Sequence, residues 1–244
     1  MGTRRDRGRS APRRSAALRA RILLIRRVDR RLEGQITAYA VDTADGWLGR
    51  AELGTIHDAL DLDPRHRDRF AHEAGPLAAV CTHGRRDPCC AERGRPLAAA
   101  LAAAYPEATW ESTHVGGDRF AGNLVVFPHG LYFGRVEPAE APAIVEAYRS
   151  GRIALERFRG RASVPMWIQA AEIHLRRELV LDGLDDVRVQ TIDRPPGGRR
   201  NVRFATPTGP RTVAVTPEPG TPMALTCHSD APEIPIVWRA TLVD

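Results

Sequence analysis

Three of the four cysteines lie close together in the sequence, at Cys81, Cys89 and Cys90. In a reducing compartment such a cluster is more typical of a metal or redox site than of a disulfide framework. Cys81 follows a short apolar run, and the other two cysteines open a stretch of helix-forming residues. A loop between a strand and a helix could therefore direct two thiolates to one metal ion, and the helix N-terminus would favour the thiolate form.

A second segment, residues 114–118, carries two further ligand-type side chains, His114 and Asp118. Gly116 and Gly117 lie between them, and two glycines allow the backbone to turn tightly enough for both side chains to face one point. Imidazole and carboxylate are harder ligands than thiolate. A combination of soft and harder ligands is found in Rieske-type iron–sulfur centres, where it raises the reduction potential. The two segments predict a metal or redox site without choosing between iron–sulfur and zinc.

Each of these residues also has a purely structural explanation. Cys81 could be a buried apolar side chain, His114 a hydrogen-bonded core histidine, and the Gly-Gly-Asp sequence a turn. Cys89 and Cys90 are adjacent and cannot easily bind the same iron atom, so that one of them is expected to be structural. The fourth cysteine, Cys227, is interpreted as structural, with a ligand role left open. No C-x-x-C motif is present, which disfavours an ordinary dithiol oxidoreductase.

The pattern of residues around these two segments predicts an α/β protein. Apolar and β-rich runs indicate strands at residues 21–26, 35–41, 47–53, 76–82, 109–114, 123–127 and 131–136. Helix-forming residues indicate helices at 89–104 and 137–148, and Pro64 marks the expected start of another helix within 61–72. From residue 76 the predicted order is strand, helix, strand, strand, strand, helix, which is the thioredoxin-like arrangement.

We therefore expect four parts in the chain. Residues 1–21 are interpreted as a disordered basic tail, and residues 22–75 as an N-terminal α/β subdomain that is incomplete. Residues 76–158 form the thioredoxin-like domain with the candidate site. Residues 159–244 form a C-terminal helix, expected at 164–181, and a small β extension with Pro/Gly loops.

Charge and hydropathy exclude some classes of function. The net charge of +6 suggests a nucleic-acid partner, but residues 1–21 alone carry +7, which leaves −1 for the rest of the chain. Nucleic acid is therefore an unlikely partner. No apolar run is long enough to span a bilayer and no signal peptide is recognisable, so no membrane association is expected and the cytoplasm is the expected compartment.

The sequence resembles the sucrase/ferredoxin-like family, thioredoxin-like [2Fe–2S] proteins that include the actin-patch-distribution proteins of fungi. The matching stretches are VCTHGRRDPCC at 80–90, HVGGDRFAGN at 114–123 and PHGLYFGRV at 128–136, with a weaker match at 169–174. The cysteine loop and the His-x-Gly-Gly segment occur in the right order and with the right separation. We expect the likeness to cover residues 22–244.

The resemblance implies a [2Fe–2S] cluster held by two Cys and two His in the fungal members. By position these ligands fall on Cys81, Cys90, His114 and Asp118, so that an aspartate stands where the family has its second histidine. The fourth ligand is therefore Asp118 or one of the alternatives Cys89, Cys227, His83 and water.

An electron-transfer protein is the function that this resemblance implies. It would be a non-enzymatic carrier that exchanges one electron with a redox partner protein. Two alternatives stay open: a thioredoxin-like binding or structural module with a structural zinc ion or no metal, and a thiol enzyme that uses a low-pKa Cys81 or Cys90.

Overall fold

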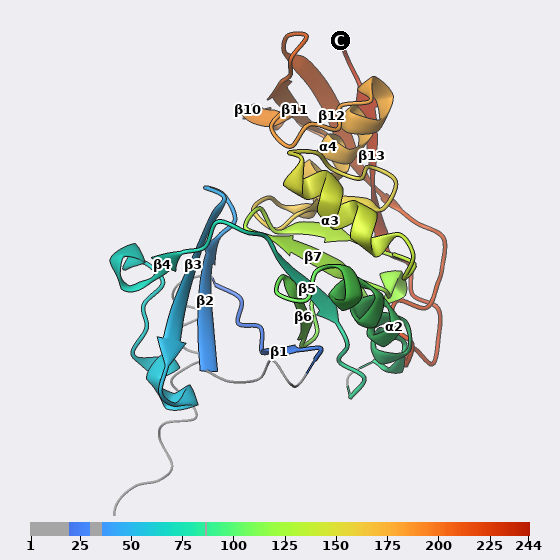
Figure 1. Cartoon of the computed structure of the whole chain (residues 1–244). Helices are drawn as coiled ribbons and strands as arrows, with labels where there is room; N and C mark the ends of the chain where they lie inside the picture. The colour runs from blue at the N-terminus through green and yellow to red at the C-terminus, as the bar shows by residue number, and fades with distance from the viewer. Residues whose placement is uncertain (1–19, 30–35, 86) are drawn as a thin grey trace, which may run out of the picture.

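The computed structural model describes residues 20–29, 36–85 and 87–244 of the chain. In this part, strands form three sheets and three α-helices accompany them, which confirms the predicted α/β class (Figure 1). Of the basic tail predicted to be disordered at residues 1–21, residues 1–19 lie outside the described residues, whereas Arg21 is described and makes hydrogen bonds. No helix within the described ranges has the length and apolar character required to cross a membrane.

The central sheet has six strands in the order β1-β6-β5-β7-β8-β9. Strands β5 and β6 are parallel and joined by helix α2, while β7 and β8 form an antiparallel hairpin that is followed by helix α3. This is the predicted thioredoxin-like order of elements. The bounds are β1 Ile25–Arg27, β5 Leu77–Cys81, α2 Pro88–Ala104, β6 Thr109–Ser112, β7 Leu124–Phe127, β8 Leu131–Phe133, α3 Ala141–Arg149 and β9 Phe158–Arg161.

Helices α2 and α3 cover one face of this sheet (Figure 1). Side chains on β5 alternate between the two faces, as expected for a strand buried on both sides. Ala78 and Val80 pack under the helices, whereas Leu77 and Ala79 face the N-terminal sheet. Cys81, the last residue of β5, lies on that second face but at the end of the strand, where the loop to α2 begins.

The N-terminal sheet consists of β2 (Ile36–Asp42), β3 (Trp47–Leu53) and β4 (Ala71–His72). The helix predicted within residues 61–72 is wrong: that stretch contains a short 3-10 turn at Arg67–Arg69 and strand β4, and a second 3-10 turn at Ile56–Leu60 precedes it. Neither turn buries a side chain. A segment without an apolar stripe has no packing energy to stabilise an α-helix, and proline at a permissible position does not change that.

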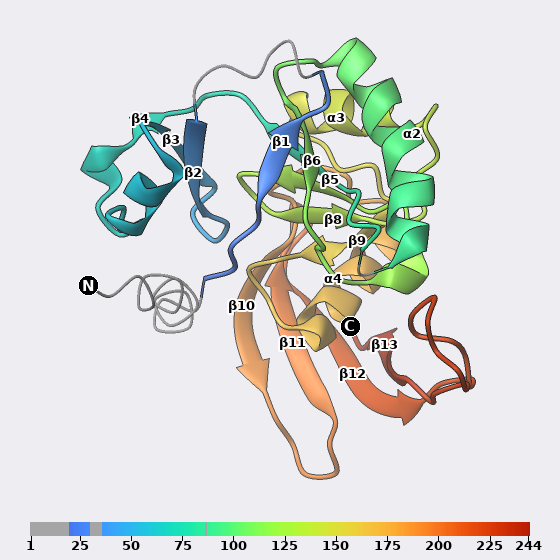
Figure 2. The same ribbon diagram turned by 90° about the horizontal axis from the view of Figure 1, so that it is seen from below.

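The C-terminal part is an antiparallel sheet packed against helix α4, as Figure 2 shows. Trp167, Ala171 and Leu175 are buried at the predicted helical spacing. Strand β9, the edge strand of the central sheet that contacts α4, was not predicted, because its sequence FRGR has no continuous apolar run and only one large apolar side chain. The bounds are α4 Met166–Leu179, β10 Arg188–Asp193, β11 Arg200–Ala205, β12 Arg211–Pro219 and β13 Ile236–Leu242.

A buried ionic triad joins α4 to the central sheet. The carboxylate of Glu172 accepts hydrogen bonds from Arg161 of β9 at 2.8–3.1 Å and from Arg176, one turn further along α4, at 2.9 Å. Arg176 is completely buried, and its guanidinium also donates to the backbone carbonyls of Leu181 and Gly183. One carboxylate therefore compensates two cations at this junction.

Candidate metal centre

The two cysteines of the first segment are positioned by a close helix–strand contact. Cys81 ends β5 and Cys90 is the third residue of α2, and each side chain is 1% exposed. Gly94, one turn further along α2, lies so close to β5 that a Cβ atom there would be 2.0 Å from the carbonyl oxygen of Cys81. Glycine is therefore required for the helix to bring its thiol to the end of the strand.

The second segment turns back on itself, as the two glycines predicted. Gly116 and Gly117 have φ angles of +88° and +75°, which side chains rarely adopt. The side-chain amide of Asn123 donates to the carbonyl of Gly117 at 3.0 Å and holds this turn. As a result the Nε2 atom of His114 lies 2.9 Å from the Oδ1 atom of Asp118.

Arg21 holds the same loop from outside. Its guanidinium donates hydrogen bonds to the carbonyl oxygens of His114, at 2.7 Å, and Val115, at 2.8 Å. The sequence interpretation assigned Arg21 to the basic tail and missed this contact. Nothing in the sequence relates two residues that are 93 positions apart. The one hint that Arg21 is ordered is its position next to a predicted apolar strand.

The structure brings the two segments together at one point. One ligand atom each from Cys81, Cys90 and His114 lie within 4.8 Å of one another, and Asp118 adds its carboxylate through the contact with His114. The Nδ1 atom of His114 is buried and has no hydrogen-bond partner among the described residues; the nearest acid, Asp87, is 3.9 Å away. A buried nitrogen without a partner beside two thiols fits a metal ligand.

The remaining candidates for the fourth ligand lie around this group. The thiol of Cys89 points to the backbone carbonyl of Asp118 at 3.8 Å, and the thiol of Cys227 to the carboxylate of Asp87 at 3.3 Å. His83 uses its Nδ1 atom to accept the backbone N–H of His114 at 3.2 Å. Each of these three side chains is thus engaged with Asp118, Asp87 or the backbone of His114. Asp118 is the candidate whose side chain contacts the imidazole of His114.

Hydrogen bonding separates the pKa values of the cysteines. The pKa of Cys81 is lowered to about 6, because the thiol of Cys90 and the backbone N–H groups of His83 and Val115 donate to its sulfur. The pKa of Cys90 is raised by the same hydrogen bond and by burial. Burial and the neighbouring thiol of Cys227 raise the pKa of Cys89 to about 11. Thiolate character is therefore concentrated on Cys81, within the group that could bind a metal.

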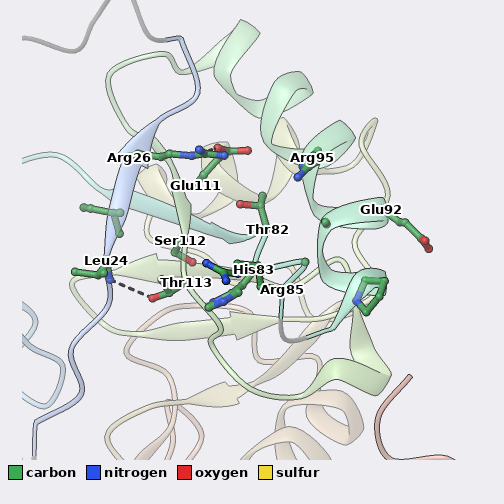
Figure 3. A pocket seen from close by; sticks show the side chains of 14 residues that line it. Leu24, Arg26, Thr82, His83, Arg85, Glu92, Arg95, Glu111, Ser112 and Thr113 are labelled. Atoms are coloured by element: carbon green, nitrogen blue, oxygen red, sulfur yellow. Dashed lines mark hydrogen bonds and ion pairs between the residues drawn. The ribbon is translucent and has the colours of Figure 1, made fainter. Parts of the chain in front are cut away.

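A groove of about 650 Å³ lies beside this group, between strand β1, the Cys81–Cys90 loop and helix α2 (Figure 3). Its labelled lining includes Arg26 and Glu111, which form an ion pair, and His83. His83 lines the groove and also accepts a hydrogen bond from the backbone of His114, so this one residue connects the groove with the metal-binding group.

The thioredoxin-like order of elements, with a Cys–Cys–His–Asp group at the end of its central strand, defines a candidate metal-binding protein of the α/β class. The chain belongs to the sucrase/ferredoxin-like family, whose model matches residues 17–160. We expected the family likeness to cover residues 22–244. The match to the family model ends at residue 160 and does not include the C-terminal sheet.

Several curated relatives are proteins named altered inheritance of mitochondria protein 32. The chain is 31% identical to the one from Saccharomyces cerevisiae over 149 residues, 54% of this chain and 47% of the relative. It is 29% identical to that of Candida glabrata over 150 residues, 54% and 48% of the two chains, and 33% identical to that of Meyerozyma guilliermondii over 95 residues, 34% of each. The chain thus spans at most about half the length of these relatives. No solved structure matches it.

Proposed function

We propose that this protein binds a [2Fe–2S] cluster and transfers electrons. The observation that carries the proposal is the convergence of one ligand atom each from Cys81, Cys90 and His114 within 4.8 Å, in a histidine whose Nδ1 atom is buried without a hydrogen-bond partner among the described residues. Membership of the sucrase/ferredoxin-like family supports the same choice over zinc.

In this proposal Cys81, Cys90, His114 and Asp118 would hold the cluster, with two thiolates and two harder ligands. The cluster would supply reversible one-electron transfer. The chain itself supplies one thiolate at neutral pH, because hydrogen bonds already lower the pKa of Cys81. Nitrogen and oxygen ligands on one iron are expected to raise the potential above that of an all-cysteine ferredoxin, as in Rieske centres.

The histidine side of the group is its more accessible side. The side chain of His114 is 17% exposed, whereas Cys81 and Cys90 are each 1% exposed. We therefore expect electrons to pass through the imidazole to a redox partner protein that docks on this side. The four cysteines are all free thiols, which agrees with a reducing compartment, and we propose that the protein works in the cytoplasm.

Reconstitution under anaerobic conditions tests the proposal directly. With ferrous iron, sulfide and a reductant, the full chain should turn red-brown, show charge-transfer bands in the visible, and contain about two iron and two sulfide per chain. A colourless protein that takes up one zinc ion per chain in competition with iron would instead favour a structural zinc site. Either result is read by metal and sulfide analysis together with the visible spectrum.

Exchange of Asp118 tests the fourth ligand. Asp118→His should keep two iron atoms per chain but shift the visible bands and the reduction potential, because the replacement changes oxygen for nitrogen on one iron. Asp118→Ala should lose most of the iron or make the cluster labile. Spectra and potentials are compared with those of the unaltered protein. If both variants match it, another group occupies the fourth position, and Asp118 is not a ligand.

A further inference from the structure

A second group of metal-ligand side chains lies next to the proposed cluster site and shares none of its four ligands. It contains Asp87, Cys227 and His228, and one ligand atom from each lies within 4.8 Å of the others. Asp87 comes directly before helix α2, while Cys227 and His228 lie in the segment between β12 and β13. The family match covers residues 17–160, so Asp87 lies inside it and Cys227 and His228 lie outside it.

Cys89 lies beside this group as a neighbour of Cys227, whose own thiol approaches the Oδ1 atom of Asp87 at 3.3 Å. One thiol, one carboxylate oxygen and one imidazole therefore meet where the C-terminal segment crosses the start of α2, and a second thiol lies next to them. Sequence spacing gives no hint of it, because Cys227 and Asp87 are 140 positions apart.

The segment that carries Cys227 is folded back onto itself, which gives it a defined shape. Met223 and Glu233 exchange two backbone hydrogen bonds, of 3.0 and 2.9 Å, at its base. At its tip, the side chain of Ser229 accepts from the backbone N–H of Thr226 at 3.3 Å. These contacts shape the segment without using the thiol of Cys227, which is left to face Asp87.

We propose that Asp87, Cys227 and His228 form a second metal site for a zinc-class divalent cation, and that the neighbouring thiol of Cys89 moves in as the fourth ligand when the ion binds. Zinc is bound in tetrahedral sites by cysteine, histidine and aspartate, and mixed sulfur and nitrogen donors select it over magnesium or calcium. Asp87 is buried, whereas Cys227 and His228 are exposed. The ion would therefore enter from solvent, between the buried carboxylate on one side and the two exposed ligands on the other.

The proposed ion would fasten the C-terminal sheet to the domain that carries the cluster. It would do so next to the cluster, since the other oxygen of Asp87 faces the Nδ1 atom of His114 at 3.9 Å. The second site does not depend on the first: it uses neither Cys81 nor Cys90, and it can be tested whether or not iron binds.

Cobalt(II) is the probe that tests the second site, because thiolate ligands and tetrahedral geometry give it intense, characteristic absorption. The full chain with Cys81→Ser and Cys90→Ser removes the cluster thiols and leaves the second group intact. This variant, kept reduced, should bind one cobalt ion per chain with thiolate-to-cobalt and visible d–d bands, and zinc should displace it.

Adding Cys227→Ser or His228→Ala to that variant should weaken cobalt binding at least about 100-fold, more than the loss of an outer partner costs. Absence of the thiolate bands in the parent variant would overturn the proposal, as would bands that persist unchanged in both additional variants. A Cys89–Cys227 disulfide, seen by mass as the loss of two hydrogens in protein purified without reductant, together with no cobalt binding after reduction, would also overturn it.

The otherwise unaltered chain provides a second measurement if the double serine variant does not fold. After iron reconstitution it should contain one zinc in addition to its iron, and Cys227→Ser should lose the zinc but keep the iron. Zinc without iron would contradict the proposed cluster; loss of that zinc in Cys227→Ser would place it in the second site, and its retention there would overturn the second site. Iron without zinc in the unaltered chain would contradict the second site alone.

Discussion

Cys90→Ser should abolish iron incorporation almost completely, whereas Cys89→Ser should leave it nearly unchanged. The two residues are neighbours in the first turn of α2, and the substitution is the same. The difference lies in direction: the thiol of Cys90 converges with Cys81 and His114, while that of Cys89 points to the backbone carbonyl of Asp118 and to Cys227. Serine is a poor substitute for a thiolate on iron.

Iron and sulfide per chain after reconstitution, with the visible absorbance, measure this difference. The pair forms its own control, because a general disturbance of the start of α2 would affect both variants. Thermal unfolding followed by circular dichroism should give similar transitions for the two proteins in the absence of iron. Loss of iron from Cys89→Ser with retention in Cys90→Ser would exchange the roles of the two cysteines and refute the ligand set.

Glu172→Ala is expected to lower the free energy of unfolding by about 3–5 kcal/mol, because it removes one partner of a buried ionic group. The carboxylate is 4% exposed and is shared by Arg161 and Arg176, the second of which is completely buried. Without it, two guanidinium groups lie close together at the junction of α4 and the central sheet and lose the carboxylate to which both are hydrogen-bonded. Urea unfolding, followed by tryptophan fluorescence, measures the loss.

A surface ion pair in the same part of the chain gives the matched control. Glu218 on β12 accepts from Arg239 on β13 at 2.9 Å, but the two side chains are 46% and 73% exposed. Glu218→Ala should therefore cost less than about 1 kcal/mol. Equal losses from the two substitutions would mean that burial does not strengthen the triad, and a smaller loss from Glu172→Ala would contradict its role at the junction.

The elements that the sequence predicts well are those whose pattern is enforced by burial. Strand β5 reads as a continuous apolar run because both its faces are covered, and α4 shows its buried stripe at helical spacing. Strand β9 has no such pattern, since Arg159 and Arg161 alternate with Phe158 and Gly160. Its pairing with β8 depends on neighbours that are already in place, which local composition does not encode.

The candidate site was predictable where its geometry is local. The turn between His114 and Asp118 follows from two glycines in sequence, because few other residues adopt their conformation. The hydrogen bonds of Arg21 to the histidine loop and of Cys227 to Asp87 join residues 93 or more positions apart. Such contacts are set by the packing of whole elements, so that no spacing rule identifies them in a single sequence.

The contact of Gly94 with the end of β5 has a consequence for how the protein matures. One thiol of the proposed pair is carried by a strand and the other by a helix, so that their separation is decided by how closely the two elements dock. A chain in which α2 has formed but not yet docked offers only isolated thiols, which capture iron weakly. The proposed cluster would therefore be incorporated only into chains in which α2 is already docked on β5, so that a bound cluster would report a correctly folded domain.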